Sequence, residues 1–420
     1  MSRTIFLLIL ISFFFLLDVI AYSGIKKVLK DIKNQNLKKV LRYVLYGASA
    51  AKIISVLVLI VVYGFNYREY QGLAAFTNAL LFVILIPQLI FVAILLLEDV
   101  FRIGEWGTNL ARKSLKVDEE STVSFHSRRK FVSQVGLGIA AIPFLGVLHG
   151  VSRGKYAFTV RKVKLKIPEL PKAFDGFTLS QISDVHSGSF DNPEKVRRGI
   201  ALLQEQQSDM IVFTGDLVNN KADEIEPWMD AFKELSAPFG KFSILGNHDY
   251  GDYYNWPKPQ DKIDNFARLK RNHAEIGFEL LLNENRHLEK DGEKIALIGV
   301  ENWGTGGFPK KGDLNKAIQG IEDLPVKILL SHDPSHWDQK VLEHEQKIQL
   351  TLSGHTHGMQ FGIEIPGFRW SPVKYRYPRW AGLYEEAEQY LYVNRGFGFL
   401  AFPGRVGIWP EVTVIELQRG

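Results

Sequence analysis

The chain has 420 residues, a formal net charge of +5 at pH 7 and no cysteine. This length permits two or three domains, and the mild charge does not favour nucleic acid as a partner, because many basic residues lie between apolar runs in the first third. The lack of cysteine excludes disulfides and thiolate zinc sites, so any metal must be bound by nitrogen and oxygen ligands.

Apolar runs in the first 150 residues predict about four transmembrane helices. About 20 apolar residues span a bilayer as a helix. Few basic residues precede the first run and no small-residue cleavage site follows it, so we favour a retained helix over a signal peptide. We expect a membrane region at 1–150 and a soluble domain at 151–420. The predicted helices are 4–22, 43–65, 73–97 and 131–148.

The basic residues between these runs predict an orientation. They are concentrated at 26–42 and 102–130, whereas the loop after the second run contains only Arg68, beside Glu69. The positive-inside rule places the two basic loops in the cytoplasm and everything after the fourth run outside it. We therefore expect an integral protein of the inner or plasma membrane with an extracytoplasmic soluble domain. If the fourth run did not span, that domain would be cytoplasmic.

Two further features of the membrane region bear on its interpretation. The segment Ser127–Val132 resembles a twin-arginine export signal, but it also suits the cytoplasmic end of an ordinary helix, and both interpretations give the same orientation. Asp18 and Lys52 are isolated charges within or near apolar runs. We expect Asp18 near a helix end and the Lys52 amine extended toward the membrane interface.

Strand and helix patterns alternate after residue 150. Alternating basic and apolar residues at 160–167 predict a half-exposed strand, and short apolar runs predict further strands. Amphipathic stretches predict helices at 193–207, 224–235 and 261–276. The soluble part is therefore predicted to be a mixed α/β domain. Other expected strands include 293–300, 326–330, 348–353, 390–393 and 412–415.

Five of the apolar runs end in a tight turn that is followed by residue types that bind metals. Open α/β sheets place their sites where strands end, so we expect these side chains to converge. Imidazole, carboxylate and amide ligands suit Mn, Fe or Zn. Asp216 is the candidate for a carboxylate that bridges two cations. The segments are Asp184-Val185-His186, Gly215-Asp216, Gly246-Asn247-His248-Asp249, Ser331-His332-Asp333 and Gly354-His355-Thr356-His357.

This ordered set resembles the calcineurin-like metallophosphoesterase superfamily, whose pattern is Asp-x-His, Gly-Asp, Gly-Asn-His-Asp/Glu, His and Gly-His-x-His. The resemblance covers roughly residues 160–420. Within the superfamily the chain looks most like the membrane-associated bacterial branch of YkuE-type phosphohydrolases, in the segments 170–177, 394–398 and 410–413. Met359 departs from that branch, which usually has glycine there, and this difference concerns substrate fit.

The resemblance implies two mixed β-sheets packed face to face, flanked by helices, with two divalent metal ions at the strand ends. It implies hydrolysis of a phosphate ester by a metal-bound hydroxide, with His248 assisting the leaving oxygen. Asp249 is expected either to orient the His248 ring or to be a structural turn residue. The implied ligands are Asp184, His186, Asp216 and His357 for one metal and Asp216, Asn247, His332 and His355 for the other.

We therefore expect a membrane-anchored phosphoesterase that acts on a phosphodiester, pyrophosphate or monoester of a small molecule or lipid. One alternative is a cytoplasm-facing enzyme that cleaves a lipid-linked nucleotide diphosphate. Another is a non-catalytic membrane sensor or scaffold with a degenerate site, against which the complete ligand set argues.

Several residues outside the motifs are weaker candidates. The aromatic and basic stretch 370–380 is expected to form either a lip for an anionic or lipid head group or a packed loop. Arg395 and Arg405 are candidate phosphate contacts, although we favour structural or surface roles for both. Tyr253 is a candidate cleft residue, and His336 is expected at the surface.

Overall fold

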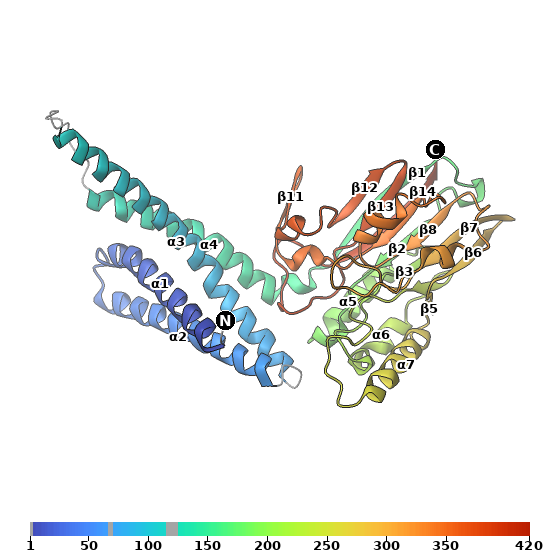
Figure 1. Cartoon of the computed structure of the whole chain (residues 1–420), viewed down its shortest axis with the longest axis horizontal. Coiled ribbons are helices and arrows are strands. Elements are labelled where there is room, and N and C mark those ends of the chain that lie inside the picture. The colour runs from blue at the N-terminus through green and yellow to red at the C-terminus, as the bar shows by residue number, and fades with distance from the viewer. Residues whose placement is uncertain (1–2, 66–69, 115–124) are drawn as a thin grey trace. The chain divides into compact units, whose positions relative to one another are not determined.

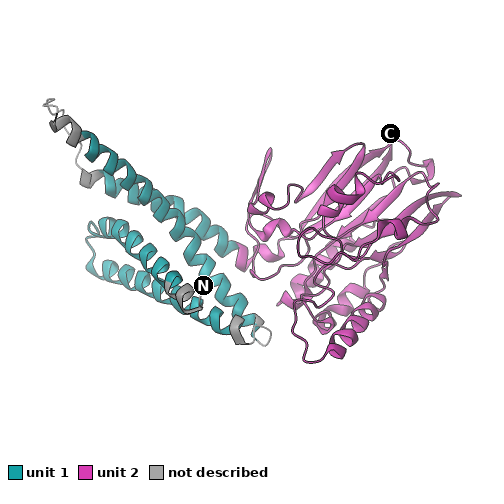
Figure 2. Cartoon of the chain, viewed as in Figure 1, with its two compact units in different colours: residues 1–149 teal, residues 150–420 magenta. Residues whose placement is uncertain are grey.

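The computed structural model describes residues 3–65, 70–114 and 125–420 (Figure 1). The chain forms two compact units, Met1–His149 and Gly150–Gly420 (Figure 2). Arg68, Glu69 and Lys116, on which the predicted orientation also depends, lie outside the described residues.

The first unit is built from long helices. Among the described residues, four helices are long and apolar enough to cross a membrane. They confirm the four apolar helices expected in the sequence, but each extends beyond its apolar run, because basic and polar residues continue the helical hydrogen bonding outside a bilayer. The helices are α1 (Arg3–Leu29), α2 (Gln35–Phe65), α3 (Gln71–Ser114) and α4 (Phe125–Ser152), whose last turn belongs to the second unit.

Lys52 is buried inside the first unit and Asp18 lies in the interior of α1, so the expectations that the Lys52 amine extends to the interface and that Asp18 lies near a helix end are both wrong. Its side chain is 0% exposed, and its Nζ lies 2.6 Å from the Asp18 carboxylate. The amine also donates to Gln88 Oε1 at 2.9 Å, and Gln88 Nε2 donates to Asp18 at 2.7 Å. A charge among apolar helices needs a partner, and this network supplies one while joining α1, α2 and α3.

The segment Ser127–Val132 forms part of the first turns of α4. Arg129 is buried there, and its guanidinium donates to Glu98 at 2.5 Å and to Asp99 at 2.7 Å. The second arginine of the pair is therefore an ion-pair partner that holds α4 against α3.

The second unit contains two six-stranded mixed sheets. In the first sheet, β2 to β5 run parallel, and β14 joins them as an antiparallel neighbour of β2. Its strands, in spatial order, are β1 (Thr159–Ile167), β14 (Glu411–Arg419), β2 (Thr178–Ile182), β3 (Met210–Phe213), β4 (Lys241–Ser243) and β5 (Glu279–Leu280).

The second sheet has a parallel centre and an antiparallel strand at each edge. A separate ribbon pairs β10 (Ile363–Ile365) with β11 (Phe368–Trp370). The strands of the second sheet, in spatial order, are β12 (Gly382–Glu386), β13 (Gln389–Val393), β9 (Leu350–Ser353), β8 (Lys327–Leu330), β7 (Glu293–Gly299) and β6 (Glu284–Lys290).

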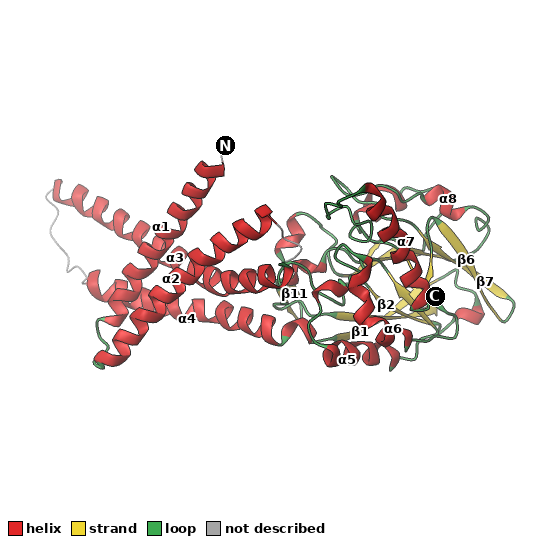
Figure 3. Cartoon of the chain, turned by 90° about the horizontal axis from the view of Figure 1, so that it is seen from below, coloured by secondary structure: helices red, strands yellow, loops and turns green. Residues whose placement is uncertain are grey.

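The two sheets pack face to face around one apolar core. Leu179 and Val212 from the first sheet meet Leu297 and Leu352 from the second. Helices cover the outer faces (Figure 3). α5 (Pro193–Gln204), α6 (Met229–Lys233) and α7 (Pro259–Glu275) contribute to the core outside the first sheet, and α8 (Leu314–Ile318) contributes outside the second. This arrangement confirms the predicted fold class.

Two predicted helices differ in detail from the structure. The helix expected at 193–207 ends at Gln204, and the one expected at 224–235 is a 3₁₀ turn, Ala222–Trp228, followed by the short α6. Pro227 explains the second difference, because proline cannot donate the backbone hydrogen bond that a continuing α-helix needs. The strands β5, β6, β10, β11 and β12 had no clear apolar signal.

Arg395 links β13, β14 and the β10–β11 ribbon from a buried position. Its guanidinium donates to Glu411 at 2.6 Å and to Glu364 at 2.7 Å, and the side chains of Arg395 and Glu411 are 2% and 0% exposed. The structure thus gives Arg395 the structural role that the sequence favoured.

Replacing Arg395 should destabilise the protein, because buried Glu411 would lose its ion pair at 2.6 Å and keep only the more distant Arg161, at 3.6 Å. We expect Arg395→Met to lower the free energy of unfolding by about 3–5 kcal/mol. Arg197→Met, in an exposed pair with Glu234, should change it by about 0–1 kcal/mol. Denaturant unfolding of the full chain in detergent measures both, and equal effects would contradict the proposed role of burial.

Candidate metal centre

The candidate site is built by the turns that follow five strands. Asp184 follows β2, Asp216 follows β3 and Asn247 follows β4 in the first sheet, whereas His332 follows β8 and His355 follows β9 in the second. Within each sheet these strands are parallel, so their carboxyl ends meet at one edge. Polar side chains from both sheets therefore face one another at this edge.

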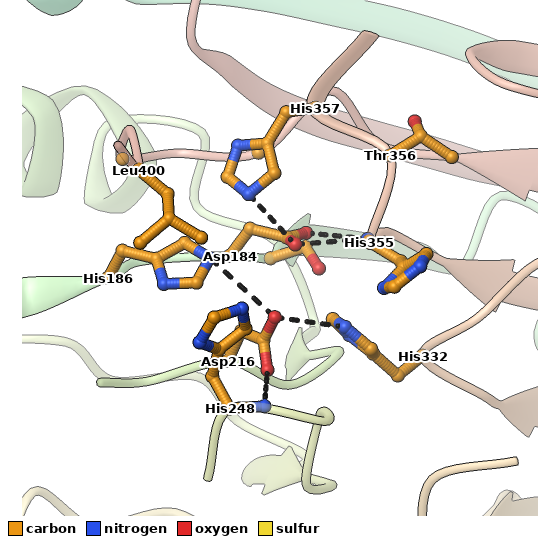
Figure 4. Close-up of polar contacts among 12 residues, drawn as sticks. Asp184, His186, Asp216, His248, His332, His355, Thr356, His357 and Leu400 are labelled. Carbon is orange, nitrogen blue, oxygen red and sulfur yellow. Dashed lines mark hydrogen bonds and ion pairs between the residues drawn. The ribbon is translucent and has the colours of Figure 1, made fainter. Parts of the chain in front are cut away.

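The predicted ligands form two adjacent groups (Figure 4). Asp184, His186 and His357 make one, and Asp216, His332 and His355 make the other. Within each group the candidate ligand atoms all lie within 4.8 Å of one another.

Asp216 lies between the two groups. Its Oδ2 is 3.6 Å from His186 Nε2 and 3.1 Å from His332 Nε2. Asn247 completes the set, since its Oδ1 lies 2.9 Å from His355 Nδ1. The structure thus brings together all seven side chains that the sequence singled out as ligands.

The nitrogen atoms of this cluster fit a bound cation. His186 Nε2, His332 Nε2 and His357 Nε2 are buried and have no hydrogen-bond partner within the described residues. An unpaired buried polar atom is unfavourable. These three atoms face carboxylate oxygens at 3.1–3.6 Å, so divalent ions between them would satisfy both the nitrogens and the oxygens.

Hydrogen bonds outside the cluster fix several ligand orientations. His332 Nδ1 donates to the carbonyl of Thr214 at 2.7 Å, which leaves Nε2 as the ligand atom. His355 Nε2 lies 2.8 Å from the Tyr377 hydroxyl, which donates to Asp333 at 3.3 Å. The sequence placed Tyr377 only in an aromatic stretch, and its contact with His355 joins segments 22 residues apart.

Charge and burial set the protonation of the cluster. Burial alone would raise the pKa of Asp184 and Asp216, but His357 beside Asp184 and His332 beside Asp216 hold both pKa values below the usual range. Burial lowers the pKa of His186 and His355, which keeps these imidazoles neutral. Burial would also lower the pKa of His332, but Asp216 raises it to about 10.

The backbone of the site is strained at the candidate ligands. Asp184, His186, Asp216, His355 and His357 all have φ between 45° and 70°, which side chains with a Cβ seldom adopt. Such residues cluster at functional sites, where surrounding structure must hold them. The residue before Asn247 must be glycine for a steric reason. A Cβ at Gly246 would collide with the Asp216 carboxylate.

His248 is held by a backbone carbonyl and not by Asp249. The His248 ring donates from Nδ1 to the Asn219 carbonyl at 2.8 Å, and its backbone N–H donates to Asp216 at 2.8 Å. Within the described residues, the Asp249 carboxylate accepts only backbone N–H groups, including those of Gly246 and Leu217. The expectation that Asp249 orients the His248 ring is therefore wrong, and the alternative of a structural turn residue fits.

A pocket of about 290 Å³ opens over the cluster. Tyr253, Phe308 and Leu400 contribute its apolar wall. Tyr253 was a candidate cleft residue, and its hydroxyl accepts from Asn247 Nδ2 at 3.1 Å, which points Asn247 Oδ1 toward His355. No motif in the sequence marked Phe308 or Leu400 as pocket residues.

Two other weaker candidates, Arg405 and His336, are buried residues with structural contacts. Arg405 is fully buried and donates to the carbonyl of Gly398 from Nε at 2.9 Å. His336 is 1% exposed and pairs with Ser331 at 2.9 Å, so its expected surface position is wrong. The buried hydroxyl of Ser331 gives His336 a polar partner inside the protein.

Comparisons with known proteins agree with this geometry. Residues 177–359 match the family described as "Calcineurin-like phosphoesterase", and residues 2–155 match "Probable Calcineurin-like phosphoesterase, transmembrane domain". "Uncharacterized metallophosphoesterase YkuE" of Bacillus subtilis is 32% identical over 60% of this chain and 83% of its own length. The chain belongs to the calcineurin-like metallophosphoesterase family.

Other members of the metallophosphoesterase family are more distant. "Phosphodiesterase YaeI" of Escherichia coli is 26% identical over 69% of this chain and 99% of its own length. "Transmembrane protein with metallophosphoesterase domain" of Danio rerio is 27% identical over 72% of this chain and 65% of its own length. The resemblance to the YkuE-type branch, expected from the sequence, is confirmed.

Removing the Asp249 carboxylate should weaken the scaffold of the site. We expect Asp249→Ala to lower thermal stability and bound metal, because each buried N–H left unpaired is unfavourable by about 1–3 kcal/mol. The control is Asp252→Ala, which removes an exposed carboxylate that forms an ion pair with Lys262. Thermal unfolding and metal analysis measure the effect. A change in the pH profile of turnover at unchanged stability would instead support the ring-orienting role.

Cation binding should release a proton from His332. Its pKa is raised to about 10 without a cation, and an imidazole must lose its proton to bind a metal. We therefore expect the affinity of the site for a divalent cation to rise with pH. We also expect about one proton to be released when the cation binds near neutral pH. Titration calorimetry in buffers of different ionisation enthalpy measures this release, and His332→Gln should abolish it. Release that His332→Gln leaves unchanged would contradict the assignment.

Proposed function

We propose that this protein is a membrane-anchored phosphoesterase that hydrolyses phosphate esters at a dinuclear metal centre. The supporting observation is the convergence of seven ligand-type side chains from two sheets, with three buried imidazole nitrogens that lack another partner in the part of the chain that the structure describes. We assign Asp184, His186, Asp216 and His357 to one metal and Asp216, Asn247, His332 and His355 to the other. The ligand types suit Mn, Fe or Zn.

The chain's own residues then have distinct roles in the reaction. When bound, two such ions supply Lewis-acid polarisation of the phosphoryl group and activation of water. The Asn219 carbonyl accepts a hydrogen bond from Nδ1 of the His248 ring, so in the protonated ring Nε2 also carries a proton, which it can give to the leaving oxygen. Tyr377 and Asp333 keep His355 in place. Tyr253 and Leu400 form part of the wall of the pocket in which the ester would bind.

The position of the domain relative to the membrane is part of the proposal. Basic residues concentrated after the first and third apolar runs favour a cytoplasmic location for those loops. With four spans, we expect the soluble domain outside the cytoplasm. The substrate class consistent with this placement is a phosphate ester of the cell envelope or the membrane surface.

A metal add-back assay tests the function. Full-length protein in detergent is stripped of metal and supplied with Mn, Fe, Zn or Mg, and turnover of an aryl phosphodiester and an aryl monoester is followed. We expect metal-dependent turnover that Asn247→Ala loses together with one metal. His248→Asn should keep both metals and lower kcat by about 10²–10⁴-fold.

The matched control for His248 is His287→Asn, at an exposed position on β6. It should leave turnover and metal content unchanged. A folded protein that binds no metal would contradict the proposed function, as would a metal-loaded protein that hydrolyses neither ester.

A further inference from the structure

The β10–β11 ribbon has one apolar face and one polar face. Its register pairs Ile363 with Trp370 and Ile365 with Phe368, so these four side chains lie on the same face. The remaining pair, Glu364 and Arg369, lies on the opposite face. The ribbon stands clear of the two large sheets (Figure 1).

The apolar face of the ribbon points to solvent. Ile363, Ile365 and Phe368 are 49%, 58% and 52% exposed. The polar face is bound to the domain instead, since Glu364 accepts from Arg395 at 2.7 Å and from Arg161 at 2.8 Å. This is the reverse of the usual orientation in a soluble domain, and clustered exposed apolar side chains mark a site of interaction.

Residues close to the ribbon in the sequence are of the types found at a membrane interface. Met359 and Tyr375 are 59% and 78% exposed, and Lys374 and Arg376 are exposed beside Tyr375. Tyrosine and tryptophan are enriched where a bilayer meets water, and basic side chains bind anionic lipids there. The apolar face of the ribbon is therefore flanked in the sequence by exposed aromatic and cationic side chains.

Backbone hydrogen bonds connect the base of the β10–β11 ribbon to the last turn of α4. The backbone N–H of Gly362 donates to Val406 at 2.9 Å, and that of Val406 donates to Gln360 at 2.8 Å. The backbone N–H of Arg405 donates to the carbonyl of Gly150 at 3.2 Å. Gly150 lies in the last turn of α4, which is apolar enough to span a membrane.

The same segment borders the metal centre. The Arg405 guanidinium lies 3.2 Å from His357 Nδ1. Leu400, which lines the pocket, donates from its backbone N–H to Gln360 Oε1 at 2.6 Å. The end of α4, the base of the ribbon and the pocket are thus joined by residues 398–406.

We infer that the apolar face of the β10–β11 ribbon is a membrane-docking surface, which enters the interfacial layer of the bilayer that α4 spans. The substrate class that follows is a phosphate ester carried by a lipid head group. This substrate class rests on the proposed function. The bilayer is the occupant because backbone hydrogen bonds join the base of the ribbon to Gly150, in the last turn of a helix apolar enough to span it, and because the exposed residues that flank the ribbon in the sequence are aromatic and cationic.

Single-cysteine labelling tests the docking, since the chain has no native cysteine. Full-length Ile365→Cys and Ile263→Cys proteins, labelled with an environment-sensitive dye, are reconstituted in vesicles of phosphatidylcholine and phosphatidylglycerol. Ile263 is the matched control, 61% exposed on α7. We expect blue-shifted emission and quenching by nitroxide-bearing lipids at position 365 only. Equal quenching at both positions, or a blue shift without lipid quenching, would overturn the inference.

The substrate class is tested with two aryl phosphodiesters, one soluble and one with a long alkyl chain that holds it in the vesicle. We expect the double variant Ile365→Asp/Phe368→Asp to lower turnover of the vesicle-held ester by roughly tenfold or more, and to leave the soluble ester unaffected. Ile263→Asp should affect neither.

The outcomes separate the two proposals. If the unmodified protein hydrolyses the soluble ester but not the vesicle-held one, the lipid substrate is wrong and the proposed function stands. Equal loss of turnover on both esters in the double variant would also overturn the docking role. If the unmodified protein hydrolyses neither ester, the proposed function fails, whereas lipid quenching at position 365 would still establish docking.

Discussion

The position of the Asp216 carboxylate is the constraint on which the site depends. One oxygen faces imidazoles from both candidate groups, and the other accepts the His248 backbone N–H. Its own backbone N–H is held by Asp249, and only glycine fits beside it at position 246. The parallel order of β2, β3 and β4 brings these turns together. A shift of one strand would therefore separate the ligands of both candidate metals.

Much of this arrangement could be predicted, because its signal is local in the chain. Each ligand segment follows an apolar run within four residues, so strand pattern and motif together located all seven side chains. The supporting contacts could not be found in this way. The Asn219 carbonyl reaches His248 across 29 residues, and a backbone atom has no residue type to recognise. The environment of Lys52 was also predicted wrongly, because its partner Asp18 lies on another helix and is distant in the sequence.

The family and the geometry constrain different parts of the interpretation. Membership of the metallophosphoesterase family indicates the fold and the class of chemistry, and the match to a transmembrane family model indicates that the helices recur with it. The orientations of individual side chains are known from the structure of this chain and not from its relatives. Tyr377, Tyr253 and Arg405 each contact a candidate ligand directly, and each belongs to a loop that sequence motifs do not cover.

The pairing of β1 with β14 has a consequence for synthesis of the chain. The first strand of the soluble domain runs parallel to the last, in register from Thr159 with Glu411 to Ile167 with Arg419. On the ribosome, the helices before Gly150 emerge early, but β1 has no partner until nearly the whole chain has been made. Long-range pairing of this kind folds slowly and leaves strand edges exposed. Premature termination after β13 would therefore yield a membrane-inserted chain with an open sheet, a direct target for quality-control proteases.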